Sequence, residues 1–223
     1  MSDVIGEILG FAVGIAVSPV PIAAVILMLF ASRARVTAPL FLVGWLIGIA
    51  LVATVVVLMP GLSADSGEPS TTTGVIKGGL GVLLLFFGVR QWVSRPGPDD
   101  EVAMPKWMAG IDTMGSGGAF GLGFLLSAVN PKNLLLAAAA GAAIGAAELS
   151  AGQNVAAIAV FTIIASLTIA VPVIGYLFAG DRLQPALDSA KDWLIQNNTA
   201  VMSVLFLVFG VILLGDAIAI IWG

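Results

Sequence analysis

Residues 16–22 read AVSPVPI and residues 128–134 read AVNPKNL, so one short proline pattern occurs twice, 112 residues apart, each time inside a long apolar run. Proline removes a backbone donor and clashes with the preceding helical turn. A membrane helix interrupted in this way needs protein or a water-filled cavity around the freed backbone groups. Broken helices in corresponding halves of a chain are typical of transporter binding sites.

The composition is that of an integral membrane protein. Of 223 residues, 59% are hydrophobic and 10% are charged, and the mean hydropathy is +1.10. An ordinary soluble domain carries about a quarter charged residues. The chain has no cysteine and no histidine, which excludes disulfides and metal sites built on thiolate or imidazole. The sequence has no basic face with aromatic residues, so nucleic-acid binding is not predicted. No cofactor is predicted either.

No catalytic motif occurs in the sequence. There is no P-loop, no nucleophile with a histidine base and no carboxylate cluster suited to two metal ions. We therefore predict that the chain is neither an enzyme nor a self-contained ATP-driven pump.

Six apolar stretches are long enough to cross about 30 Å of hydrocarbon, which takes roughly 20 residues. The first and fourth contain the proline motifs and are longer than one crossing needs. The predicted fold is an all-α membrane protein with six transmembrane helices, of which the first and fourth are broken. The stretches are 4–32, 37–59, 74–94, 115–146, 152–179 and 198–222.

The charges between these stretches predict the orientation. Basic residues follow the first, third and fifth stretches, whereas acidic residues follow the second and fourth. By the positive-inside rule, the chain lies in its membrane with both termini on the non-cytoplasmic side. The basic residues are Arg33, Arg35, Arg90, Arg95, Lys106, Arg182 and Lys191, and the acidic ones are Asp65, Glu68 and Glu148.

Three spans in each half give the two halves opposite orientations, which is the geometry of an inverted repeat. A second similarity supports duplication, because residues 85–89 (LFFGV) resemble residues 207–211 (LVFGV) at an offset of 122. The predicted domains are a first three-helix repeat at 1–95, a cytoplasmic linker at 96–114 and a second repeat at 115–223.

The offset grows by ten residues between the two similarities, and segment 183–195 is the natural place for the insertion. Its leucines fall on one helical face, and Asp188, Lys191 and Asp192 lie largely elsewhere. This pattern predicts a short amphipathic helix on the cytoplasmic surface before the sixth span, with Trp193 at headgroup depth.

Lys132 is the most unusual residue of the chain, because it follows Pro131 near the middle of the fourth span with no other charge between Asp112 and Glu148. A lysine at this depth costs roughly 2.5 to 3.5 kcal/mol unless it is paired or hydrated. In one interpretation, Lys132 faces a central cavity, where it binds an anionic group or takes part in proton coupling. In the other, backbone carbonyls freed at the opposing break around 17–18 hold it, and it only ties the two halves together.

The remaining candidates flank the two breaks. Asn130 and Asn133 carry amides that donate and accept, so they either cap the break locally or contact a ligand. The half-helices that begin after the breaks direct partial positive charge toward the site, which favours an anionic group. The predicted substrate-binding set is Ser18, Pro19, Pro21, Asn130, Pro131, Lys132 and Asn133.

Asp216 is a further ionisable residue within an apolar stretch. It lies about six residues from the outer end of the sixth span, or roughly 9 Å at the helical rise. It is a candidate for proton coupling together with Lys132, or an interfacial carboxylate that reaches water.

Two other groups of residues have more ordinary interpretations. Thr162, Ser166 and Thr168 in the fifth span are expected to bond to the backbone of their own helix. Gly44 and Gly48 have GxxxG spacing, which indicates either close helix packing or a dimer face.

With these residues assembled, the chain resembles the LysE superfamily of small exporters, whose members have about six spans, a P-G-P motif in the first and N-P-K in the fourth. Here the motifs are PVP at 19–21 and NPK at 130–132. Within the superfamily, the chain is most similar to the GAP branch, the Sap or peptidoglycolipid and sulfolipid addressing proteins of actinobacteria, through these motifs and the segment 192–194. The similarity covers nearly the whole chain. Val20 stands where amino-acid exporters have glycine, so their site is not carried over.

The resemblance implies export of envelope glycolipids or their precursors, beside a larger lipid-transport complex. We therefore predict a homodimeric membrane exporter of an amphipathic anionic envelope lipid, whose head group binds between the broken helices while its acyl chains stay among membrane lipids. One alternative is a proton-coupled exporter of small polar solutes such as amino acids. Another is a non-transporting scaffold of a lipid-export complex.

Overall fold

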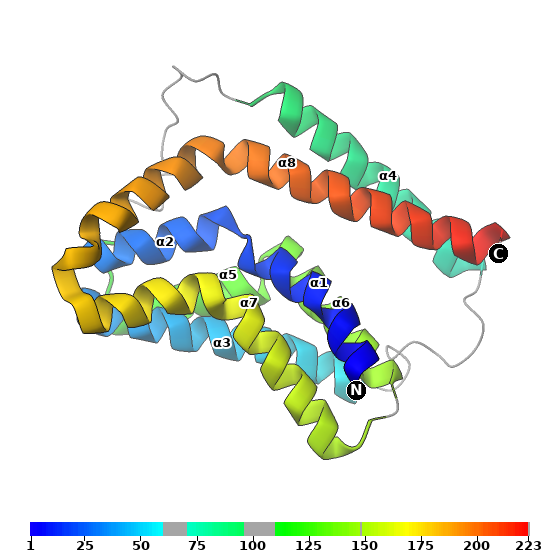
Figure 1. Cartoon of the computed structure of the whole chain (residues 1–223), viewed down its shortest axis with the longest axis horizontal. Helices are drawn as coiled ribbons and strands as arrows, with labels where there is room; N and C mark the ends of the chain where they lie inside the picture. The colour runs from blue at the N-terminus through cyan, green and yellow to red at the C-terminus, as the bar shows by residue number, and fades with distance from the viewer. Residues whose placement is uncertain (60–70, 96–109, 148, 223) are drawn as a thin grey trace. The chain divides into compact units, whose positions relative to one another are not determined.

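The computed structural model describes residues 1–59, 71–95, 110–147 and 149–222. The described residues form helices and no strand (Figure 1). Most of the predicted linker 96–114 lies outside the described residues. The helices are α1 (Ser2–Ala16), α2 (Pro19–Phe30), α3 (Ala34–Leu58), α4 (Thr71–Val93), α5 (Ser116–Ala128), α6 (Pro131–Ala146), α7 (Ala151–Ala179), the 3-10 helix η2 (Gly180–Leu183) and α8 (Gln184–Trp222).

The helix bounds agree with the predicted apolar stretches, and the all-helical membrane fold is confirmed. Three helical segments of the described chain are long and apolar enough to cross a membrane, and two bent helix pairs pass the same test when each is taken as one span. The bent pairs are α1 with α2 and α5 with α6. α4 has 23 residues, and within it the segment Gly81–Val93 is a shorter apolar helix.

One boundary differs from the prediction. The amphipathic segment 183–195 is not a separate helix, because α8 continues without interruption from Gln184 to Trp222. Only Gln196–Trp222 has the hydropathy of a membrane span. Nothing in residues 190–200 stops a helix: there is no proline or glycine in that stretch.

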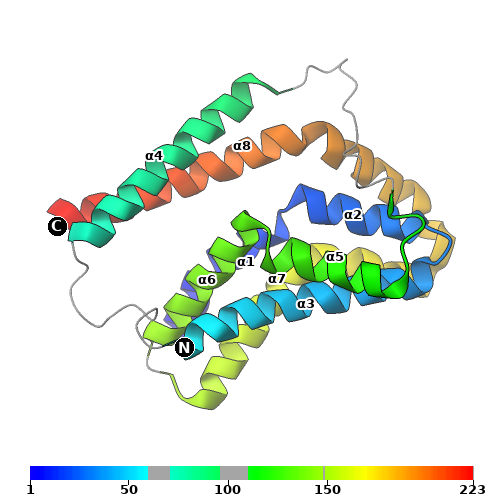
Figure 2. The same cartoon turned by 180° about the vertical axis from the view of Figure 1, so that it is seen from behind.

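The helices fall into two compact units. The first contains α1, α2, α3, α5, α6, α7, η2 and the beginning of α8, and the second contains α4 and the rest of α8. In the first unit, α3 packs against α5, α6 and α7, while α1 packs against α6 and α7. Figure 2 shows α5 lying along α3.

Glycines allow the close approach of α3 and α5. A methyl group on Gly44 would overlap the carbonyl oxygen of Phe120, and one on Gly123 would overlap the carbonyl oxygen of Phe41. A methyl group on Gly48 would likewise overlap the side-chain oxygen of Ser127. The GxxxG spacing at 44 and 48 therefore serves packing within the chain, as small residues do wherever membrane helices approach closely.

The second unit is an antiparallel helix pair with a seam of small residues. Gly74 of α4 lies against Ile221 of α8, and Gly88 lies against Leu207. The Ser203 hydroxyl donates a 2.5 Å hydrogen bond to the Gly88 carbonyl. The pair thus combines close backbone approach with a hydrogen bond between helices, the two means by which membrane helices associate.

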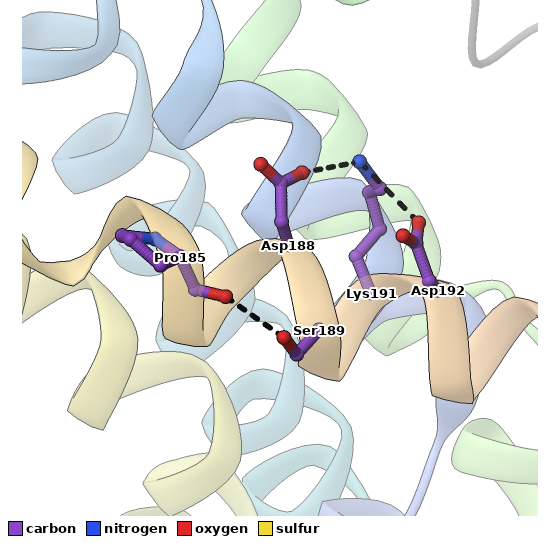
Figure 3. A network of polar contacts seen from close by, with 5 residues as sticks. All are labelled: Pro185, Asp188, Ser189, Lys191 and Asp192. Carbon is purple, nitrogen blue, oxygen red and sulfur yellow. Dashed lines mark hydrogen bonds and ion pairs between the residues drawn. The ribbon is translucent and has the colours of Figure 1, made fainter.

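The first turns of α8 carry an ion-pair network (Figure 3). Lys191 Nζ lies 2.7 Å from Asp188 Oδ1, 3.6 Å from Asp192 Oδ1 and 5.1 Å from the centre of the Phe30 ring at the end of α2. Burial acts to lower the pKa of Lys191, but the hydrogen bonds and charges of the two aspartates outweigh it, so its pKa lies above the ordinary value. Lys191 therefore stays charged at neutral pH and holds α8 against α2.

Replacing Gly44 with alanine should destabilise the protein, because the added methyl group meets backbone of α5 that cannot rotate away. Overpacking of this kind costs about 1 to 3 kcal/mol. The measurement is the thermal unfolding midpoint in detergent. Gly10→Ala is the matched control, since nothing lies within 4 Å of a methyl group there. Equal midpoints for the two variants would contradict the packing role of Gly44.

Candidate functional site

The first break separates α1 from α2. The two helices meet at an angle of 54°, with φ and ψ of −85° and 52° at Val17 and −104° and 102° at Ser18. Pro19 and Pro21 lie in the first turn of α2, where a missing N–H is tolerated. In a continuous helix, residue 21 would donate to the Val17 carbonyl. Because α1 ends at Ala16 and α2 begins at Pro19, the break leaves that carbonyl without a helical donor.

The second break separates α5 from α6 at an angle of 63°. Asn130 caps α6, because its Oδ1 accepts a 3.1 Å hydrogen bond from Lys132 N. The backbone N–H of Asn130 donates to the Leu125 carbonyl. It therefore does not reach the carbonyl of Leu126, which would be its acceptor in a regular helix. Asn133 Nδ2 donates to the Leu126 carbonyl at 2.9 Å and satisfies it. Asn130 thus performs the local capping role predicted as one alternative.

A buried hydrogen bond joins the two breaks. Ser18 Oγ donates to Asn133 Oδ1 at 3.0 Å. Asn133 is fully buried and Ser18 is 4% exposed. The Asn133 amide therefore satisfies a carbonyl of its own break with its nitrogen and a hydroxyl of the opposing break with its oxygen.

Lys132 makes a second contact between the breaks. Its Nζ donates to the Val17 carbonyl at 3.3 Å. This is the contact that the second interpretation of Lys132 predicted, and its acceptor is the carbonyl that the break leaves without a helical donor. The Lys132 side chain is half-buried and Val17 is 38% exposed, so the pair lies at an accessible edge of the site.

Thr168 is a residue of the site that sequence reasoning missed. Its Oγ1 donates a 2.6 Å hydrogen bond to the Ala16 carbonyl, the last residue of α1, and not to its own helix. The expectation for Thr162 and Ser166 was also wrong, since their buried hydroxyls have no hydrogen-bond partner. A threonine in a membrane helix has carbonyls of its own helix within reach, so no sequence signal distinguishes Thr168 from the other two.

The structure therefore brings together five of the predicted residues, Ser18, Pro19, Pro21, Lys132 and Asn133, and adds Thr168 and the Val17 backbone. Asn130 and Pro131 shape the second break beside them. Asp216 belongs to α8 in the other unit, and its side chain lies outside the described part of the structure. Among the described residues, no group of three or more acidic side chains could hold a metal ion.

These features define a polytopic helical membrane protein in which two helix breaks from distant parts of the sequence satisfy each other. The chain belongs to the Sap family, described as sulfolipid-1-addressing protein, whose family model matches residues 8–219. No curated protein and no solved structure matches the chain. The family assignment confirms the resemblance to the Sap branch.

Replacing Thr168 with valine should destabilise the first break, because it leaves the Ala16 carbonyl without a donor. A buried acceptor left unsatisfied costs about 1 to 3 kcal/mol. Thermal unfolding in detergent measures the loss. Thr168→Ser keeps the hydroxyl and should unfold within a few degrees of the wild type. A valine variant as stable as the serine variant would show that the hydrogen bond contributes nothing.

Proposed function

We propose that this protein exports an amphipathic, anionic envelope lipid across the inner membrane, and that the head group binds at Lys132 between the two breaks. The observation that carries the proposal is the partly exposed Lys132 side chain, whose ammonium group lies where the two helix breaks meet. An ionisable residue at membrane depth is functional by default. The description of the family as sulfolipid-addressing supports a lipid with a negatively charged head group.

Each bent pair is proposed to cross the membrane as one span. Helices of 15 and 12 residues joined at 54° extend over about 36 Å, and helices of 13 and 16 residues joined at 63° extend over about 37 Å. Both lengths exceed the hydrocarbon thickness of about 30 Å. A re-entrant loop must reverse its direction, which bends of this size do not do.

The pattern of helix contacts supports an inverted repeat of three plus three spans. In such a repeat, α1, α2 and α3 correspond to α5, α6 and α7 in that order. The α3–α5 contact then has its counterpart in the α7–α1 contact, and the α3–α6 contact has its counterpart in the α7–α2 contact. All four contacts are present, whereas the α1–α6 contact has no comparably extensive counterpart between α5 and α2. The contact between α2 and α3 likewise has its counterpart between α6 and α7. α4 and the last part of α8 would then be the third spans of the two repeats.

The acyl chains are proposed to remain in the bilayer during transport. A shallow groove of about 480 Å³ runs between α3 and α7 and is lined almost entirely by apolar side chains, with Ala50 and Ala159 among them. Both helices have the length and hydropathy of membrane spans. The groove therefore offers a path along the protein surface that hydrocarbon can fill.

Labelling of single cysteines can test the proposed spans, and the chain offers a background without native cysteines. We expect Ser2→Cys and Ser150→Cys to react with an impermeant maleimide from outside the cell, and Ser32→Cys and Ser189→Cys to react only from the cytoplasmic side. Reaction of Ser2→Cys and Ser32→Cys from the same side would mean that α1 and α2 form a re-entrant loop.

Replacing Lys132 with glutamine should reduce lipid export at least tenfold, because the site loses its ammonium group. The measurement is the appearance of a labelled anionic lipid in the outer leaflet of cells that produce equal amounts of folded protein. Arg35→Gln is the matched control, since it removes a positive charge at an exposed position outside the site. Unchanged export by the Lys132 variant would overturn the proposed mechanism.

A non-transporting scaffold is the second candidate function. The observation that favours it is that Ser18, Lys132 and Asn133 already bond to groups of the protein itself. A scaffold predicts that Lys132→Gln lowers stability and the capture of partner proteins together. An exporter predicts loss of export while the partner proteins are still captured.

A further inference from the structure

A proline interrupts the hydrogen bonding of α7 without ending the helix. Pro172 lies inside α7, about two turns before its last residue. In a regular helix the N–H of residue 172 donates to the carbonyl of residue 168, but proline has no N–H and its ring clashes with that carbonyl. α7 is bent within its length in both views of the fold (Figure 1, Figure 2). The turn that begins at Thr168 therefore resists bending less than the turns on either side of it.

The residue at this weak turn also bonds to another helix. Thr168 Oγ1 donates to the Ala16 carbonyl at 2.6 Å, and Ala16 is the last residue of α1. A threonine in a helix commonly donates to a carbonyl one turn earlier in its own helix, and that bond favours a bend. The hydroxyl therefore has two competing acceptors of the same chemical kind, one in α1 and one in α7. A switch between them exchanges one hydrogen bond for another.

The Thr168 bond restrains the residue next to the lysine contact. Ala16 precedes Val17, whose carbonyl accepts the hydrogen bond from Lys132 Nζ. Two consecutive carbonyls of the chain are thus held by side chains from two other helices, α7 and α6. Loss of the first bond frees the end of α1, and the acceptor of the lysine moves with it.

The part of α7 before the bend has buried polar groups that do not oppose its movement. The hydroxyls of Thr162 and Ser166 are buried without a hydrogen-bond partner. A shift of this part of the helix breaks no hydrogen bond of theirs, and any partner that they gain stabilises the shifted position. The apolar groove between α3 and α7 lies beside the same part of the helix, at Ala159 and Thr162.

We infer that α7 is a hinged helix whose first part moves about the turn 168–172, and that Thr168 is its latch. While Thr168 donates to Ala16, Lys132 stays bound to the Val17 carbonyl. When Thr168 releases Ala16, the lysine is free to take a head group. This inference rests on the proposed binding of a head group at Lys132.

The distance between α1 and the first part of α7 tests the latch. Spin labels on Val13→Cys and Val155→Cys, both at exposed positions of a chain without native cysteines, report this distance by double electron–electron resonance. The full-length protein is reconstituted in phosphatidylcholine vesicles. Thr168→Val should increase the population of a second distance about three- to tenfold, the effect of one hydrogen bond. Thr162→Val is the matched control, because it removes a buried hydroxyl of the same helix that has no partner.

Combining Thr168→Val with Pro172→Ala tests whether Pro172 is the hinge. The alanine restores a donor to the carbonyl of residue 168 inside α7, so the second population should return to the wild-type level. Pro39→Ala in the same background is the matched control, since Pro39 also lies inside a helix, α3, and it should leave the second population unchanged. A second population that persists with Pro172→Ala would overturn the hinge.

Equal distance distributions for Thr168→Val and Thr162→Val would overturn the latch. If Thr168→Val does not fold, Pro172→Ala alone decides, because the restored bond should straighten α7 and shift the distance. A distribution identical to that of the wild type would then overturn the hinge.

Acetylation of Lys132 tests the connection between the latch and the site. The rate of reaction with acetic anhydride is measured by peptide mass spectrometry, and the rate of the same lysine in protein unfolded in dodecyl sulfate is the reference. Thr168→Val should raise the rate in the folded protein about three- to tenfold, whereas Thr168→Ser and Thr162→Val should leave it unchanged. An unchanged rate in Thr168→Val would overturn the control of Lys132 by Thr168.

None of these measurements requires a lipid to bind or to cross the membrane. Failure of the hinge or the latch therefore leaves the proposed head-group site standing, and the export assay with Lys132→Gln tests that site separately.

Discussion

The constraint on which this structure depends is that hydrocarbon offers no hydrogen-bond partner to a backbone group. Two proline motifs interrupt apolar helices, and each interruption leaves carbonyl groups without their helical donors. Side chains from elsewhere in the chain supply the donors: Lys132 to Val17, Asn133 to Leu126 and Thr168 to Ala16. The two breaks therefore satisfy part of each other's hydrogen-bonding capacity, and α7 supplies a further donor.

The two motifs have the same sequence pattern but make different hydrogen bonds. Asn130 turns its side chain onto its own helix as a cap, whereas Ser18, at the matching position, makes no cap and donates across to Asn133. The second motif also carries Lys132 where the first has Val20. The second motif therefore supplies Lys132 and Asn133, and the first supplies the Val17 carbonyl and the Ser18 hydroxyl that bond to them.

The sequence predicted those parts of the fold that depend on covalent chemistry and composition. The positions of the breaks were predictable because proline lacks an N–H whatever surrounds it, and the helix bounds followed from hydropathy. The contact of Lys132 with the opposing carbonyl was one of two interpretations, since charge and depth alone do not tell what a lysine faces. The hydrogen bond of Thr168 and the packing of Gly44 on α5 could not be predicted, because both depend on which helix lies opposite.

Half of the Lys132–Val17 contact belongs to the main chain, and this affects how the site can be recognised. Every amino acid at position 17 supplies the same carbonyl oxygen, so no side-chain replacement there deletes the acceptor. Alanine scanning would pass over Val17 without a signal, and natural variation at that position would carry no record of its role. The information for this acceptor lies instead in the neighbouring residues that end α1 and begin α2, because that interruption leaves the oxygen without a helical donor.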